Sequence, residues 1–301
     1  MVTKFLIISD THNLRLDGTA DAGSKPLQLP TPKVDVLLHC GDLTQVGGVS
    51  SFKQALKMLG SMDAELKLVI AGNHDLELDS KYWELQCSDE ENPEDPEDHD
   101  LAVEAMTGTD AREVGVLFLN EGTHTFKLNN GATFTIYVSP YTPAFGDWAF
   151  AYKPDEDRYS DRSHAAQDVT SIATNPIPEG VDIVMTHGPA KGILDLCPQG
   201  NVGCGNLRRA LHRVKPKIHC FGHIHEGYGI EVVDWNKASV DAPAIRQLSE
   251  RKSTGNPYPE PFSWRQESKD QTLAVNASIM TGDHKPANAP WFISLDLPRA
   301  T

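Results

Sequence analysis

Five short apolar runs of this chain are each followed at once by side chains that can bind a metal ion or move a proton. Carboxylate and amide oxygens with imidazole nitrogens form a mixed ligand set that suits two ions of the Mn, Fe, Zn or Ni type. Each residue alone would be explained as well by a turn, a helix cap or a surface histidine. Because the pattern recurs, it predicts a dinuclear metal site rather than a closed, cysteine-rich zinc site. The residues are Asp10 and His12; Asp42; Asn73, His74 and Asp75; His187; His223 and His225.

Spacing separates candidate ligands from a candidate proton donor. Asp10 and His12 stand two residues apart, so both side chains can point to one side of the chain and reach one ion. The two histidines of the last motif have the same spacing and can reach two neighbouring ions. Asp42 has two carboxylate oxygens and can bridge two cations. Asn73 offers a neutral oxygen ligand, whereas the adjacent His74 should point elsewhere and is a candidate proton donor.

The apolar runs before these residues predict the strands of an α/β sheet. Apolar residues in these runs tend to follow one another rather than alternate with polar ones, which is typical of strands covered on both faces. The predicted strands span 5–8, 34–38, 66–71, 181–185 and 217–221. Helical spacing of apolar residues predicts helices at 50–59 and 207–214, the second capped by Asn206. Ligand sites in open α/β sheets form at the carboxyl ends of strands, which is where the candidate ligands stand.

The remaining segments predict a single domain over residues 1–301 with two insertions. Weaker patterns predict helices at 79–86 and 100–106 and strands at 114–119, 123–128, 132–138, 229–235, 272–276 and 291–295. Residues 88–100 hold eight carboxylates and two prolines and are expected to form a solvated insertion. The polar, proline-containing stretch 236–271 is expected to be a second excursion. No fixed-period repeat or linker divides the chain.

The composition favours an intracellular globular protein. The chain has 301 residues, 39% of them hydrophobic, and a mean hydropathy of −0.38. No apolar run approaches the roughly 18 residues of a membrane span. The net charge of −15 disfavours long nucleic acids and anionic membranes, although bound metal ions would still let a small phosphate ester approach. Five scattered cysteines and the absence of a signal-peptide pattern predict a reducing, cytoplasmic setting.

Other residues have plainer or open interpretations. His39 and His219 are expected to be core residues or groups that support the ligands. The aromatic stretch 141–150 could line a ring-binding pocket near the metals or could serve packing alone. Arg15, in the loop after His12, is a candidate phosphate contact. The remaining histidines are expected at the surface: His99, His124, His164, His212 and His284.

The segments that carry the candidate ligands resemble the motifs of the calcineurin-like metallophosphoesterase superfamily and, more narrowly, of its metallophosphoesterase-domain-containing branch. They read LLHCGDLTQVGG (37–48), VIAGNHDLELD (69–79), DIVMTHGPAKGILD (182–195) and KIHCFGHIHEGYG (217–229). The resemblance covers most of the chain apart from 88–100 and about 237–271. It implies an α/β fold, a four-layer α/β/β/α sandwich of two mixed β-sheets flanked by helices.

The resemblance also implies a role for each residue. One metal would be bound by Asp10, His12, Asp42 and His225, and the other by Asp42, Asn73, His187 and His223. The ions would be Mn²⁺, Fe²⁺/Fe³⁺ or Zn²⁺. Asn73 and His74 would contact the substrate phosphate, and His74, oriented by Asp75, would protonate the leaving group. Some members of the branch have glycine where this chain has His223, so its presence favours a complete second metal site and an active enzyme.

Together these observations predict a phosphoesterase that hydrolyses a small phosphodiester, such as a cyclic nucleotide, by attack of a hydroxide that bridges two metals. Three alternatives stay open. They are a protein phosphatase, a Lewis-acid enzyme of small-molecule biosynthesis that acts on a non-phosphate substrate, and a weakly active nucleotide-binding scaffold. The sequence leaves open the physiological substrate, the identity of the metals and the oligomeric state.

Overall fold

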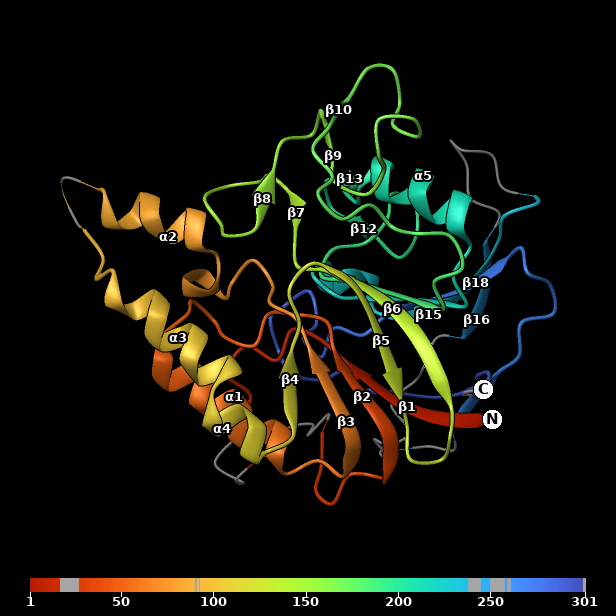
Figure 1. Ribbon diagram of the computed structural model, residues 1–301, viewed down its shortest axis with the longest axis horizontal. Coiled ribbons are helices and arrows are strands. Elements are labelled where there is room, and N and C mark those ends of the chain that lie inside the picture. Colours follow the sequence, from red (N-terminus) through yellow and green to blue (C-terminus); the bar gives the residue numbers. More distant parts are fainter. Residues whose placement is uncertain are drawn as a thin grey trace.

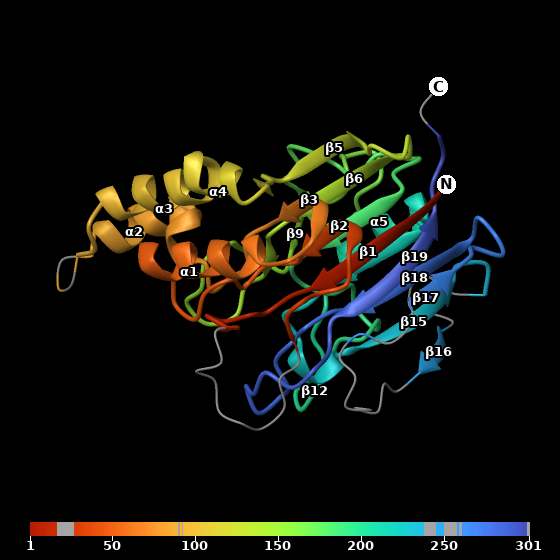
Figure 2. The ribbon, with the colours of Figure 1, turned by 90° about the horizontal axis from the view of Figure 1, so that it is seen from below.

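Two mixed β-sheets lie face to face in the computed structural model of the protein (Figures 1 and 2). The structure describes residues 1–16, 27–89, 91, 93–237, 245–249, 258 and 261–299. Apolar side chains of both sheets, such as Phe5 and Ile7 from one and Ile218 and Val275 from the other, meet in a shared core. Because the two sheets share this core, we keep the proposal of one domain over 1–301.

The first sheet has six strands, and β1 runs antiparallel to β19 while the other neighbours are parallel. Its order is β17 (Phe262–Trp264), β19 (Trp291–Asp296), β1 (Val2–Ile8), β2 (Val34–His39), β3 (Ala64–Val69) and β4 (Val116–Phe118). The parallel strands β1, β2 and β3 therefore end at the same edge, where the first three motifs follow them.

The second sheet has seven strands and is parallel in its centre, from β18 through β14 and β11 to β6. Its order is β16 (Ile245–Ser249), β15 (Gly229–Asp234), β18 (Gln271–Asn276), β14 (Ile218–Phe221), β11 (Ile183–Thr186), β6 (Thr133–Ser139) and β5 (Gly122–Lys127). The two remaining motifs follow β11 and β14.

Helices cover the outer faces of both sheets, so the predicted α/β/β/α sandwich is confirmed. Phe52 of α1 (Val49–Gly60) packs in one apolar cluster with Leu6 and Leu37 of the first sheet, and α3 (Glu97–Thr107) and α4 (Thr109–Glu113) join the same cluster. On the other side, Leu207 of α5 (Gly205–Val214) packs with Val184 of the second sheet. The helix α2 (Ser80–Cys87) precedes α3.

Short elements occupy the loops. Three two-stranded ladders pair β7 (Thr142–Pro143) with β8 (Ala151–Tyr152), β9 (Glu156–Asp157) with β10 (Thr170–Ser171), and β12 (Leu196–Cys197) with β13 (Gly200–Asn201). Two 3₁₀ turns span Leu76–Leu78 and His225–Gly227. Among the helices that the structure describes, none has the length and apolar character needed to cross a membrane.

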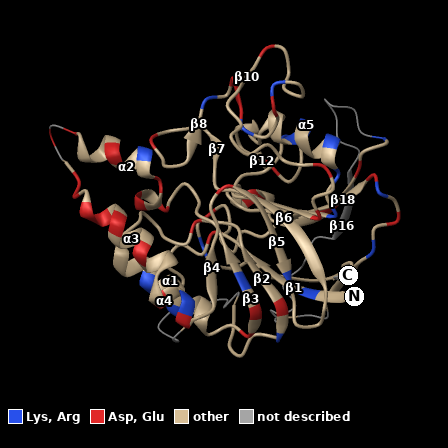
Figure 3. Cartoon of the chain, viewed as in Figure 1, with Lys and Arg blue, Asp and Glu red and all other residues tan. Residues whose placement is uncertain are grey.

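Three local predictions differ in part from the structure. The stretch 236–271 is only partly an excursion from the fold, because β16 and β17 lie within it and each pairs with the edge of a sheet. Its residues 238–244, 250–257 and 259–260 lie outside the described part of the chain. The acidic stretch 88–100 ends inside α3, whose first turn carries acidic side chains that favour a helix N-terminus (Figure 3). The N-cap of α5 is Cys204, whose sulfur accepts a hydrogen bond from the amide of Leu207, and not Asn206.

Candidate metal centre

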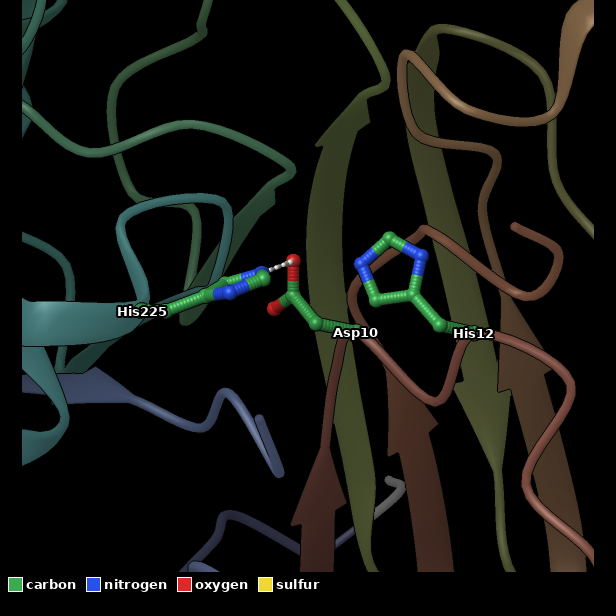
Figure 4. A group of neighbouring side chains, drawn as sticks. All are labelled: Asp10, His12 and His225. Carbon is green, nitrogen blue, oxygen red and sulfur yellow. Dashed lines mark ion pairs between the residues drawn. The ribbon is translucent and has the colours of Figure 1, made fainter. Parts of the chain in front are cut away.

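The candidate ligands lie in two groups. They follow the carboxyl ends of β1, β2 and β3 in the first sheet and of β11 and β14 in the second sheet. Within each group the possible ligand atoms all lie within 4.8 Å of one another. In the first group, Asp10 lies between His12 and His225, and its Oδ1 is 3.4 Å from Nε2 of His225 (Figure 4). The second group consists of Asp42, His187 and His223.

Asp42 connects the two groups. Its Oδ2 lies 3.5 Å from Nε2 of His12 in the first group. Its Oδ1 lies 3.3 Å from Nε2 of His187 in the second group. One carboxylate oxygen therefore faces each group, which is the arrangement expected of a residue shared between two ions.

The backbone at these residues is unusual. Asp10, Asp42 and His223 have φ values of 53°, 54° and 67°, in the left-handed region where Asp and His occur more often than most residues. Two hydrogen bonds hold these turns together: the amide of Asp10 donates to the carbonyl of Gly41 at 3.0 Å, and the amide of His223 donates to Oδ1 of Asp10 at 3.0 Å. Strained conformations of this kind persist where the surrounding structure requires a side chain in one place.

Two glycines let the chain approach the carboxylates closely. A Cβ on Gly222 would lie 2.0 Å from Oδ2 of Asp10, and one on Gly72 would lie 2.2 Å from Oδ1 of Asp42. Both positions therefore require glycine if the carboxylates are to stay where they are.

The two carboxyl groups remain ionised although they are buried. Burial alone raises the pKa of Asp10, but the hydrogen bond and charge of His225 bring this pKa down to about 2. Burial likewise opposes ionisation of Asp42, yet the nearby His187 holds the pKa of Asp42 well below its usual range. Burial lowers the pKa of His223 to about 3, so this imidazole is neutral and its unprotonated ring nitrogen can act as a ligand.

A pair of metal ions fits the donor atoms that are present. Nδ1 of His12 is hydrogen-bonded to the carbonyl oxygen of Thr44 at 3.0 Å, so this nitrogen carries the proton of the neutral ring. Its Nε2 is buried and has no hydrogen-bond partner among the described residues. Nδ1 of His187 is bonded in the same way to the carbonyl oxygen of Cys40, and its Nε2 faces Oδ1 of Asn73 at 2.9 Å. Nε2 of His12 is therefore free to bind a metal ion, whereas Nε2 of His187 donates a hydrogen bond to Asn73 here and would bind a metal ion after losing its proton. These nitrogens among carboxylate and amide oxygens match mixed N/O metal ligation.

His74 lies beside the first group and is a member of neither group. Its ring contacts that of His12 edge-on, with the centroids 4.8 Å apart. Nδ1 of His74 bonds to the carbonyl oxygen of Gln45 at 2.5 Å, and its amide donates to Oδ1 of Asp42. The Gln45 carbonyl therefore fixes which nitrogen carries the proton and leaves Nε2 of His74 for a substrate.

The expectation that Asp75 orients the His74 ring directly is wrong. The buried carboxylate of Asp75 instead accepts hydrogen bonds from the amides of Leu43, Thr44 and Gly72. Asp75 thus joins the loop that carries Gln45 to the turn 72–75 that carries His74, and it positions the His74 ring through the backbone.

Arg15 does not lie with the ligand groups. Its Nε donates to Oε1 of Gln54 on α1, and the side chain lines a cavity of about 500 Å³ between α1 and the loop after β1. The phosphate contact of Arg15 stays a prediction. His39 and His219 are fully buried, as expected, and each is hydrogen-bonded to a threonine hydroxyl.

Two aromatic side chains that contact the candidate metal centre were not predicted individually from the sequence. Trp148 and Phe145 contact His74 and His223, whereas Phe150, from the same stretch, packs in a small apolar cluster. Part of the stretch 141–150 therefore serves packing and part lies beside the candidate metal centre, and the predicted ring-binding pocket stays a prediction. The exposed His284, predicted as an ordinary surface residue, has its ring 5.1 Å from that of His225. No local pattern distinguishes His284, because only the folded chain brings it to the site.

Comparisons with known proteins agree with this geometry. Residues 3–227 match the family model described as calcineurin-like phosphoesterase. The chain is 32% identical to Metallophosphoesterase domain-containing protein 1 of Homo sapiens over 300 residues, 99% of this chain and 72% of that protein. It is 31% identical to UPF0046 protein T07D4.2 of Caenorhabditis elegans over 238 residues, 78% of this chain and 54% of that protein.

One further relative is named as a lyase rather than as a phosphoesterase. The chain is 32% identical over 237 residues to a protein of Emericella nidulans named Probable rhamnogalacturonate lyase C, which is 78% of this chain but 18% of that protein. Since so little of the fungal protein is matched, its name carries no activity over to this chain.

Proposed function

Because this chain belongs to the calcineurin-like phosphoesterase family, with the metallophosphoesterase-domain-containing proteins as relatives, we propose that it is a phosphodiesterase. The family and the two ligand groups make it a metal-dependent phosphoesterase. The finer proposal is that it hydrolyses a small phosphodiester such as a cyclic nucleotide. The observation that carries the proposal is the carboxylate of Asp42 between two ligand groups, with His74, the proposed proton donor, beside them.

The proposed ligand sets use all seven residues. Asp10, His12, Asp42 and His225 would hold one ion, and Asp42, Asn73, His187 and His223 would hold the other. Two bound ions of the Mn²⁺, Fe²⁺/Fe³⁺ or Zn²⁺ type supply Lewis acidity toward phosphate oxygens and lower the pKa of a coordinated water. The orientation of the two Asp42 oxygens, one toward each group, supports its assignment as the bridging ligand.

His74 is proposed as the acid that protonates the leaving oxygen. The Gln45 carbonyl binds Nδ1–H, so a second proton, carried on Nε2 of the imidazolium, is the one that the ring would transfer. Asn73, next to it in the chain, is proposed to contact the phosphate as well as a metal. An alkyl diester leaves as an alkoxide, which needs a proton more than an aryl leaving group does. A positioned acid therefore favours a diester.

The small size of the proposed substrate follows from charge. The net charge of −15 repels a long polyanion, whereas one phosphate can be held by the two ions. The five cysteines are free thiols in the structure, in keeping with the proposed reducing, cytoplasmic setting.

The test is a substrate panel with the purified, Mn²⁺-loaded protein. We expect turnover of bis(p-nitrophenyl) phosphate and of cyclic nucleotides to exceed turnover of p-nitrophenyl phosphate. A panel of phosphopeptides tests the rival protein phosphatase. Preference for phosphopeptides, or an absence of hydrolysis of every diester at full metal occupancy, would overturn the proposal.

A further inference from the structure

A single loop places two aromatic rings against imidazoles of the metal centre. The loop connects β7 and β8 (Figure 1). Trp148 packs against His74, with ring centroids 4.0 Å apart and the planes inclined by 34°. Phe145 contacts His223 edge-on, with centroids 5.2 Å apart. One ring of the loop therefore touches the proposed proton donor and the other touches a proposed metal ligand.

Hydrogen bonds hold this loop at both ends. The amide of Thr142 donates to the carbonyl of Phe150 at 2.9 Å, and the amide of Phe150 donates to the buried carboxylate of Asp79 at 2.7 Å. Between the rings, Gly146 adopts a φ of 58°, and a Cβ there would lie 3.4 Å from the Trp148 ring. The glycine thus permits the tight turn that separates the rings, and their positions are built into the loop.

The two rings differ in what they can still bind. Trp148 is half-buried, and one of its faces is already taken by His74. Phe145 is 49% exposed, whereas the nearby Phe150 is 6% exposed in the core. Single exposed apolar residues are common on protein surfaces. Phe145 differs from such residues because hydrogen bonds hold its loop and because its ring contacts His223 of the candidate metal centre. Its exposed apolar ring therefore lies next to the proposed substrate site.

Phenylalanine can recognise a ligand only through apolar contact and ring stacking, because it has no hydrogen-bonding group. An aromatic side chain that stacks on a nucleobase adds binding energy, and this energy depends little on which base is bound. We propose that Phe145 determines specificity by stacking on a planar ring carried by the phosphoester. The substrates are then aryl or nucleoside phosphoesters rather than alkyl or sugar phosphates. This inference rests on the proposed function, because it names the substrate class of the same site.

The test compares two ligands that differ only in the ring. Adenosine 5′-monophosphate and ribose 5-phosphate share the sugar and the phosphate, and calorimetric titration of the Mn²⁺-loaded protein gives the affinity of each without turnover. We expect the adenine compound to bind about 5- to 150-fold more tightly, the range for one stacked base. Phe145→Ala should bring this ratio close to one, and Phe145→Tyr should preserve it.

A matched control separates ring recognition from a general loss of apolar surface. Leu85 on α2 is 68% exposed, and Leu85→Ala should leave the ratio unchanged. Metal content and the thermal unfolding temperature of each variant are measured alongside, and because Phe145 is exposed we expect both to match the wild type.

The outcomes distinguish this inference from the proposed function. Equal affinities for the two ligands, no binding of either, or a ratio that survives Phe145→Ala overturns the role of Phe145, even if diesters are hydrolysed. An adenine preference that depends on Phe145 supports the role, even if no diester is hydrolysed and the proposed phosphodiesterase function fails.

Discussion

The two sheets bring different chemistry to one site. The ends of β1, β2 and β3 carry both carboxylates and the amide, together with one imidazole: Asp10, Asp42, Asn73 and His12. The ends of β11 and β14 carry imidazoles alone: His187, His223 and His225. Each of the two ligand groups takes members from both sheets. Neither sheet could therefore form either group alone, and the centre exists only when the shared core has brought the sheets together.

The difference between the sheets also resolves an electrostatic problem. Asp10 and Asp42 are 0% and 2% exposed, and an isolated buried carboxylate is strongly unfavourable. The charges of His225 and His187, which come from the opposite sheet, lower the pKa of these two carboxyl groups. Bound cations would serve the same purpose, so metal binding should be linked to the packing of the two sheets.

The largest effect is expected at the residue that joins the two ligand groups. Asp42→Asn keeps the size of the side chain but removes the charge that faces both groups. We expect both metals to be lost and activity to fall on the order of 10³-fold, as when a central electrostatic group is removed. Metal content by mass spectrometry and kcat/KM measure this. Asp161→Asn, at an exposed carboxylate, is the control. Retention of both metals would exclude a bridging role for Asp42.

Removing the proton donor should separate chemistry from metal binding. His74→Asn removes the proposed acid, whose ring is held by the Gln45 carbonyl and which belongs to neither ligand group. We expect kcat to fall by about 10²- to 10⁴-fold, with a larger loss for alkyl than for p-nitrophenyl diesters. Metal content should match that of the wild type and of His164→Asn, a variant of an exposed histidine. Loss of a metal would instead place His74 among the ligands.

A glycine substitution can disturb the first ligand group without altering a ligand. A Cβ on Gly222 would meet Oδ2 of Asp10 at 2.0 Å, so Gly222→Ala must move that carboxylate. We expect destabilisation by about 1–3 kcal/mol and loss of the metal in the first group before the second. Gly205→Ala is the control, because a Cβ there has no neighbour within 4 Å among the described residues. Thermal unfolding and metal titration measure both effects, and equal loss of both metals would contradict the division into groups.

Much of this candidate metal centre could be predicted because its residues are marked by their immediate neighbours in the sequence. Each candidate ligand follows directly after an apolar strand, and parallel strands end at a common edge. Five strand ends therefore predicted the gathering of Asp10, Asp42, His187 and the other ligands. The same reasoning located β1, β2, β3, β11 and β14, whose apolar runs are buried on both faces.

The features that escaped prediction depend on contacts distant in sequence. The partner of His74 is a backbone carbonyl, which no residue type at position 45 would reveal. The strand β17 is three residues long and is defined by its pairing with β19, about thirty positions later. The contact of Phe145 with His223 likewise follows from the packing of one loop against the second sheet.

The two sheets also carry a matched pair of buried histidines whose titration opposes folding in acid. Burial lowers the pKa of both His39 and His219 to about 3, so both are neutral in the folded protein. Unfolded histidine binds a proton near pH 6.5, so each residue should reduce stability by about 1.4 kcal/mol per pH unit below that value. His39→Leu and His219→Leu should each flatten the fall in stability between pH 6.5 and pH 5, measured by urea unfolding. An unchanged slope would mean that these histidines do not contribute to the acid sensitivity.

At neutral pH the same two variants should differ from each other. Nδ1 of His39 accepts a hydrogen bond from the buried amide of Gly41, and this amide loses its partner in His39→Leu. Nδ1 of His219 has no partner among the described residues, and the Thr186 hydroxyl beside it still donates to the carbonyl of Gly188 in His219→Leu. An unsatisfied buried donor costs about 1–3 kcal/mol, so His39→Leu should be the less stable variant by about that amount. Equal urea midpoints of the two variants would show that the Gly41 amide finds another hydrogen-bond partner in His39→Leu. The hydrogen bond between Gly41 and His39 would then add no stability to the first sheet that the second sheet lacks.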